Sequence, residues 1–139
     1  SAFSTLARAL KEDPANDTTQ ERLDRVARAT SRFQDLAQVY ERLADELIAA
    51  GDNGPADATT IASSLTMMAA RVYEADLGDL EPAVARYRKV LEIDPASREA
   101  ALSLERLFRS AGRYADLSLV LQTKAEIVDD VLEKKEALF

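Results

Sequence analysis

The amino-acid sequence predicts an all-α fold. Apolar residues make up 47% of the chain, enough for a packed core, and most of them are Ala, Leu and Val, of which the first two favour helices. Four glycines and four prolines leave little turn material for a β-sheet protein. The chain also repeats itself at a fixed spacing, which is typical of stacked helix pairs.

The first three helices are expected over residues 2–12, 17–30 and 32–50. Residues 2–12 carry Phe3, Leu6 and Leu10 at helical spacing, and the helix ends before Pro14. The apolar stripe of residues 32–50 is longer and consists of Phe33, Leu36, Tyr40, Leu43 and Leu47.

Four further helices are expected over residues 57–76, 79–93, 97–110 and 113–128. The apolar stripe of the first of these consists of Ile61, Leu65, Met68, Val72 and Tyr73. Gly78 and Gly112 each permit a tight turn between two helices, and Pro95 ends residues 79–93. Val131 to Phe139 are expected to begin another helix.

The segment from Gly51 to Asp57 lies between two long predicted helices. Its oxygen ligands and glycines invite a calcium-loop interpretation, but the 12-residue loop with its closing bidentate Glu is missing. A helix-ending glycine, followed by a helix that Pro55 opens and Asp57 caps, explains the residues better. We expect an insertion of 13 residues here that lengthens both neighbouring helices, so that this pair protrudes.

The chain matches itself when shifted by 81 residues. Asp13-Pro14-Ala15 then falls on Asp94-Pro95-Ala96, and residues 2–44 contain 13 identities with the shifted sequence. Ungapped matches also include Arg25, Arg28, Arg32 and Asp35 on Arg106, Arg109, Arg113 and Asp116. Two Ala-rich helices can agree by chance, but chance would not also align the Asp-Pro-Ala turn.

A shorter period of 34 residues separates Gly78 from Gly112. Around the first of these glycines, turn, apolar, small, aromatic and closing proline residues follow in the order Gly78, Leu80, Ala83, Tyr87 and Pro95. In this order and period the chain resembles the tetratricopeptide repeat family, although Met67 stands where that family has Trp. The resemblance implies a right-handed α-solenoid of antiparallel helix pairs, with about three repeats.

The resemblance also implies a single repeat domain over residues 1–139. Its expected parts are a partial repeat over 1–14, a repeat over 15–50 with the insertion 51–63, repeats over 64–97 and 98–131, and the start of a further helix over 131–139. Because both ends would fall inside repeats, we expect a segment of a longer array.

Composition argues against several functional classes. A net charge of −7, from 25 acidic and 18 basic residues, disfavours nucleic-acid binding, which usually needs a basic excess. No apolar stretch approaches the roughly 20 residues that span a bilayer, and no signal-peptide pattern opens the chain. The chain has no Cys and no His, so it lacks thiol chemistry and the commonest general base. A cytoplasmic location is the plainer expectation.

No pattern of catalytic residues is present. The adjacent carboxylates Asp45-Glu46 and Asp129-Asp130 diverge on a helix, so neither pair can flank a substrate bond. The sequence also contains no nucleophile elbow and no glycine-rich phosphate loop. We therefore expect that the protein is not an enzyme and uses no cofactor or metal.

The resemblance implies that the first helix of each pair lines a concave groove, with Arg42 outside it. The residues that it assigns to partner binding are Arg25, Arg28, Leu65, Met68, Val72, Leu102, Arg106 and Arg109. Some members of the family grip a peptide's C-terminal carboxylate with Lys, Asn and Arg. That mode is not expected here, because the matching positions hold Glu21, Arg25, Ala69, Glu99 and Ser103.

Two interpretations of the four groove arginines remain open. They can bind acidic residues of a partner, or they can pair locally with carboxylates one helical turn away, as Glu21–Arg25, Asp24–Arg28 and Glu105–Arg109. Under the first interpretation the groove is basic, apolar and basic in turn. It then suits an acidic protein or peptide segment with an apolar anchor.

The expected function is a protein–protein interaction scaffold that binds a partner segment in this groove. The alternatives are an architectural spacer and a regulatory domain of a larger multidomain protein. Nucleic acids and membranes are not expected as partners. Weak end-to-end self-association is expected from the apolar residues near the two ends, which are Phe3, Leu6, Leu10, Leu132, Leu138 and Phe139.

Overall fold

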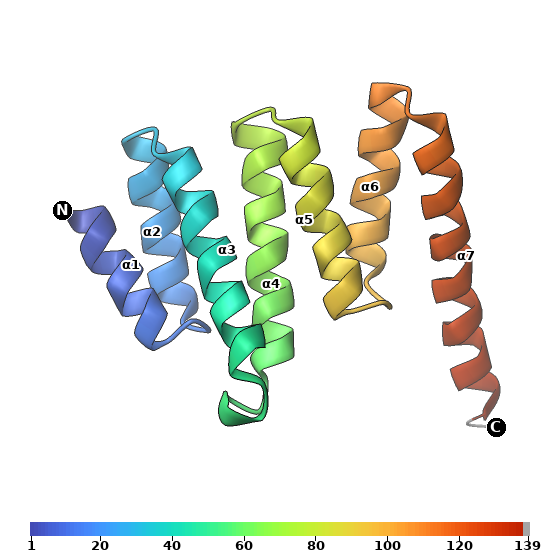
Figure 1. Cartoon of the computed structure of the whole chain (residues 1–139), viewed down its shortest axis with the longest axis horizontal. Coiled ribbons are helices and arrows are strands. Elements are labelled where there is room, and N and C mark those ends of the chain that lie inside the picture. The colour runs from blue at the N-terminus through green and yellow to red at the C-terminus, as the bar shows by residue number, and fades with distance from the viewer. Residues whose placement is uncertain (138–139) are drawn as a thin grey trace. The chain divides into compact units, whose positions relative to one another are not determined.

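The computed structural model describes the backbone of residues 1–137 and the side chains of residues 1–130. Helices are the only regular structure in this part of the chain, as predicted (Figure 1). The α-helices are α1 (Ala2–Glu12), α2 (Asp17–Ala29), α3 (Phe33–Ala50), α4 (Ala58–Arg71), α5 (Leu80–Ile93), α6 (Arg98–Ala111) and α7 (Tyr114–Ala137). A 3-10 turn, η1 (Gly51–Asn53), follows α3, and a π-helical turn, η2 (Val72–Asp76), continues α4.

The chain forms two compact units that divide within α5. Unit 1 is Ser1–Arg86 and holds α1 to α4, η2 and the start of α5. Unit 2 begins at Tyr87 and holds the rest of α5 together with α6 and α7. The single repeat domain and the right-handed solenoid stay predictions.

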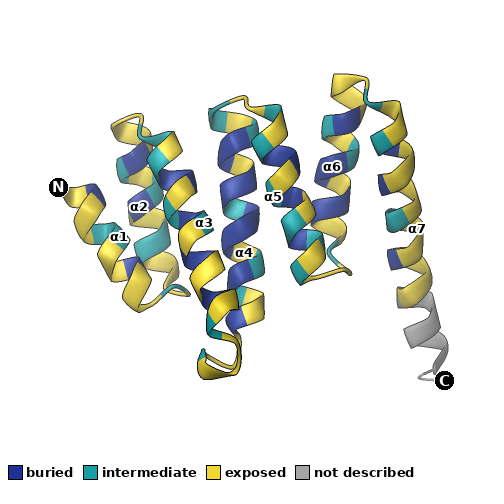
Figure 2. Cartoon of the chain, in the orientation of Figure 1, coloured by how far each residue is buried: buried dark blue, intermediate teal, exposed yellow. Residues whose placement is uncertain are grey.

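The core of unit 1 centres on the packing of α3 against α4. Leu36 and Tyr40 of α3 are buried, as are Ala62, Leu65 and the other residues that form a stripe along α4 (Figure 2). Small side chains at buried positions let two helix backbones approach closely, and larger ones fill the space between them. Both predicted apolar stripes therefore serve mainly as core.

The turn after α2 and the turn after α6 have the same hydrogen bonds, as the 81-residue repeat predicts. These bonds are Arg32 N–H to Ala27 at 2.8 Å and Ser31 N–H to Arg28 at 3.4 Å, and Arg113 N–H to Phe108 at 2.9 Å and Gly112 N–H to Arg109 at 3.3 Å. This is the Schellman arrangement, which satisfies the last helical carbonyls. It requires a left-handed residue, supplied by Ser31 (φ 55°) and by Gly112 (φ 70°).

The Asp-Pro-Ala turns before α2 and α6 also match. In each turn the Asp carbonyl accepts from the N–H three residues later at 3.1 Å. The residue at that position caps the following helix: Asn16 accepts from the Thr19 N–H at 3.1 Å, and Ser97 from the Ala100 N–H at 3.2 Å. The sequence repeat is therefore also a repeat of local structure.

The helices on both sides of residues 51–57 are long, as predicted, while the insertion itself stays a prediction. α3 has 18 residues, α4 with η2 has 14 and 5, and α2 has only 13. Five additional residues in α3 amount to about 7.5 Å of helix, which is more than one turn. The closed end of the α3–α4 hairpin accordingly extends past α2 (Figure 1).

The last helix differs from the prediction. α7 runs without a break from Tyr114 to Ala137, so the expected helix end at residue 128 and the new helix from Val131 are wrong. No Gly or Pro follows Gly112, and Asp129 and Asp130 are exposed, so nothing there interrupts the helix. The remaining predicted positions, Leu138 and Phe139, lie outside the described residues.

Candidate functional site

Two of the predicted groove residues in unit 1 belong to the core. Leu65 is 0% exposed and Val72 is 3% exposed, so neither can contact a partner, and their assignment to a binding surface was wrong. The reason is that the α4 stripe packs against α3. Met68 is half-buried, whereas Arg25 and Arg28 are exposed on α2.

Arg28 is held by carboxylates of its own chain. Its Nε donates to Asp24 at 2.8 Å, and its Nη1 donates to Asp76 of η2 at 2.7 Å. These bonds, that to Asp24 foremost, raise the pKa of Arg28. The guanidinium also lies 5.8 Å from the centre of the Phe33 ring. Arg28 therefore ties α2 to η2, which confirms the local-pairing interpretation for this residue.

The predicted residues of unit 2 lie on the surface of α6. Leu102, Arg106 and Arg109 are all exposed. Arg109 pairs with Glu105 at 3.2 Å, and Lys124 of α7 reaches the same carboxylate at 3.1 Å. Local pairing is thus confirmed for Arg109 as well.

A hollow of about 260 Å³ opens beside Met68 in unit 1, and we name it the acidic hollow. Its lining consists of Asp17, Gln20, Glu21, Asp24 and Met68, from α2 and α4. Three of these five side chains are carboxylates. This surface is therefore acidic around an apolar residue, whereas the sequence predicted a basic flank.

Tyr40 of α3 supplies an unusual polar atom in unit 1. Its side chain is only 1% exposed, and its hydroxyl has no hydrogen-bond partner among the described residues. Burial, followed by the nearby charge of Asp24, raises the pKa of Tyr40, so the hydroxyl stays protonated.

A second hollow, of about 450 Å³, lies between α1 and α3 in unit 1, and we name it the basic hollow. Its charged lining residues are Arg8, Lys11, Arg32, Arg42, Asp35 and Glu46, above an apolar floor that includes Phe3 and Leu43. Sequence reasoning missed this site and used Arg42 only as a residue outside the groove. The available signal was two pairs of cations, Arg8 with Lys11 on α1 and Arg32 with Arg42 in the otherwise acidic segment 32–50, and these form a site only when the two helices are placed side by side.

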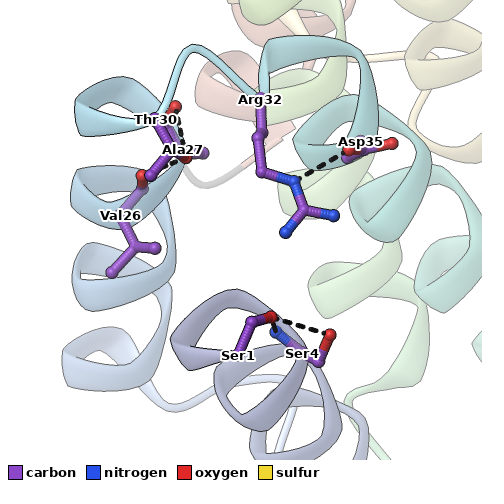
Figure 3. A network of polar contacts seen from close by, with 7 residues as sticks. All are labelled: Ser1, Ser4, Val26, Ala27, Thr30, Arg32 and Asp35. Atoms are coloured by element: carbon purple, nitrogen blue, oxygen red, sulfur yellow. Dashed lines mark hydrogen bonds and ion pairs between the residues drawn. The ribbon is translucent and has the colours of Figure 1, made fainter.

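Arg32 is held in place at the edge of the basic hollow. Its guanidinium lies 4.3 Å from the centre of the Phe3 ring, and its Nε donates to Asp35 at 3.0 Å. Figure 3 shows the terminal nitrogens directed away from Asp35, toward the first turn of α1, where Ser1 and Ser4 lie. The fork of Arg32 is therefore fixed in orientation while its outer N–H groups remain available.

Among the described residues, no cluster of three or more carboxylates could hold a metal ion. No helix in that part of the chain is long and apolar enough to cross a membrane. No protein-family model and no curated protein matches the chain. The tetratricopeptide assignment therefore stays a prediction.

Proposed function

We propose that this chain is a tetratricopeptide-like scaffold that binds a segment of another protein at the acidic hollow. The observation that supports this proposal is that the half-buried Met68 lies among three carboxylates in the lining of the hollow. Met is unbranched and polarizable, so it adapts to varied apolar side chains. The carboxylates around Met68 attract lysine and arginine side chains of a partner. The partner segment is therefore basic with an apolar anchor, the reverse of the charge expected from the sequence.

The packing of unit 1 supports a binding surface on α2 and α4. Leu23 and Ala27 of α2 and Leu65 of α4 are fully buried, so the backbones beneath the hollow are fixed by core contacts. A site on rigid helices presents its side chains with less loss of conformational entropy on binding. Shallow helical surfaces of this type suit extended or helical segments of a partner.

Selection from a random peptide library on the full chain tests this proposal. Selected peptides should carry Lys or Arg around an apolar residue. Met68→Ala should raise their Kd about tenfold, because a central apolar contact contributes more than about 1 kcal/mol. The matched control is Leu119→Ala, since Leu119 is an exposed apolar residue of unit 2 (61%) and should leave Kd unchanged.

The alternative function is an architectural spacer or a regulatory domain. The local pairing of Arg28 and Arg109 favours it, because these side chains already have partners within the chain. A spacer predicts that no selected peptide binds saturably, or that Met68→Ala and Leu119→Ala have equal effects. Either result would rule out the proposed binding surface. A cytoplasmic location and weak end-to-end self-association stay predictions.

A further inference from the structure

The basic hollow concentrates positive charge in an acidic protein. Four cations and two carboxylates line it, an excess of two positive charges, although the whole chain carries −7. Two of the cations, Arg8 and Arg42, are exposed and form no ion pair with any described residue. Lys11 lies 4.0 Å from Glu46, and both side chains are largely exposed, so that pair holds the ammonium only weakly.

The 81-residue repeat does not explain these cations. The matching position to Arg8 is Lys89, which pairs with Glu92 at 3.4 Å, and the matching position to Arg42 is Thr123. A second repeat therefore forms the same turns without this set of charges. The fold does not require a basic lining between α1 and α3.

Arg32 and its counterpart Arg113 each pair with a carboxylate three residues later, but only the second carboxylate also pairs with another arginine in the described part of the chain. Asp116 accepts from Arg113 at 2.8 Å and from Arg88 at 3.3 Å, whereas Asp35 serves Arg32 alone among the described residues. In unit 1 the fork is held at Nε and stacked on Phe3, with its terminal nitrogens toward α1. Two parallel N–H groups held in this way match the geometry of a carboxylate.

The floor of the basic hollow can receive an apolar side chain. Phe3 is 6% exposed and Leu43 is 4% exposed, so both belong to the packed base, and the half-buried Ala7 and Val39 of the same lining offer the apolar contact. The first turn of α1, including Ser4, borders the same space, and the positive end of that helix dipole favours an anion. The apolar floor and the basic edge together favour a ligand that carries a negative charge next to an apolar group.

The charges beyond the hollow distinguish a peptide from a nucleic acid. Next to the hollow on α3, a second surface is lined by Glu41 and Asp45 together with Arg42 and Glu46, the last two of which also line the basic hollow. A long phosphodiester chain leaving the hollow would meet these carboxylates and a protein of net charge −7. A short acidic peptide can end before them.

We propose that the basic hollow binds a short acidic segment of a partner protein. One of its carboxylates lies on the fork of Arg32, and an apolar side chain rests on the half-buried Ala7 and Val39. Arg8 and Arg42 attract the neighbouring acidic residues. This surface shares no lining residue with the acidic hollow, so it is a second binding site that does not depend on the first.

Titration of the isotope-labelled full chain with a capped Glu-Glu-Leu-Glu-Glu peptide, followed by NMR, tests the proposal. Shift changes should map to α1 and to residues 32–46, which line the hollow. Arg8→Glu with Arg42→Glu should raise Kd by about tenfold or more, since two charge-assisted contacts become repulsive. The matched control is Arg22→Glu with Arg98→Glu, which changes the net charge equally at two exposed sites outside the hollow and should alter Kd less than about twofold.

Four results would overturn the proposal. The peptide with Gln in place of Glu could bind equally well, or the control pair could lose as much affinity as the test pair. A 12-nucleotide single strand that binds the same residues more tightly than the peptide would assign the hollow to nucleic acid. Titration with the acidic peptide could also give no shift changes in α1 and α3 while library-selected basic peptides still bind. That result would reject the basic hollow alone and leave the function proposed for the acidic hollow intact.

Discussion

Ser31 occupies a backbone position that favours glycine. Its φ is 55°, and the matching residue in the other repeat is Gly112 with φ 70°. A left-handed conformation costs a residue with a Cβ roughly 1–2 kcal/mol, and a glycine avoids this cost but is more flexible when unfolded. The left-handed position is therefore occupied by a serine in the turn after α2 and by a glycine in the matching turn after α6.

Exchanging the two residues tests this interpretation. Ser31→Gly should leave the free energy of unfolding unchanged or raise it by up to about 1 kcal/mol. Gly112→Ser should lower it by about 1 kcal/mol through backbone strain alone, because a Cβ at Gly112 meets nothing within 4 Å. Urea unfolding of the full chain measures both changes. A clear loss of stability in Ser31→Gly would show that the serine side chain is needed in this turn.

Removal of the Tyr40 hydroxyl should not destabilise the protein. An unpaired buried hydroxyl contributes no hydrogen bond and carries a desolvation cost, so Tyr40→Phe should be neutral or raise the free energy of unfolding by about 1 kcal/mol. Tyr73 is the matched control, because its hydroxyl bonds to Glu41, and burial first and this bond next raise its pKa to about 12. Tyr73→Phe should cost about 0.5–1.5 kcal/mol in thermal or urea unfolding. Equal losses in both variants would mean that Tyr40 has a polar partner.

At the scale of elements, helix positions follow from sequence where turn residues mark them. Pro14, Pro95 and Gly112 fixed three helix ends to within two residues, and the long apolar stripes beside residues 51–57 predicted the protruding α3–α4 hairpin. The end of α7 was missed, because no Gly or Pro follows Gly112, so no turn residue marks where this helix stops. The π-helical turn η2 was also not predicted, since a local change of hydrogen-bond spacing leaves no apolar period of its own.

The link between α2 and η2 gives a prediction at this scale. A double-mutant cycle with Asp76→Asn and Arg28→Gln should show a coupling free energy of about 0.5–1 kcal/mol. We expect no more, because Arg28 is 48% exposed and solvent screens the pair. The coupling should shrink between low salt and 0.5 M salt. A coupling of zero at low salt would show that Asp76 does not hold α2.

At the scale of the whole molecule, the sites were harder to predict than the helices. Periodicity identifies which residues share a helical face, but Leu65 and Val72 show that it does not decide whether that face meets solvent or a neighbouring helix. The basic hollow depends on residues of α1 and α3, which are separated by α2 in sequence and adjoin only after folding. Its charges also resemble an ordinary solvated face when each helix is taken alone.

The two hollows of unit 1 carry opposite charge and should act independently. The acidic hollow is lined from α2 and α4 and the basic hollow from α1 and α3, with no residue in common. Effects at sites without shared partners are usually additive within about 0.5 kcal/mol. A basic library-selected peptide and the acidic Glu-Glu-Leu-Glu-Glu peptide should therefore bind at the same time. Each Kd should change less than about twofold when the other peptide is saturating.

Isothermal titration with one peptide, in the presence and absence of the other, measures this independence. Free peptides of opposite charge can pair with each other in solution, so a titration without protein provides the correction. Arg8→Glu with Arg42→Glu should weaken only the acidic peptide, and Met68→Ala only the basic one. Mutual exclusion of the two peptides would mean that they occupy one surface, because binding in separate hollows gives no reason for competition.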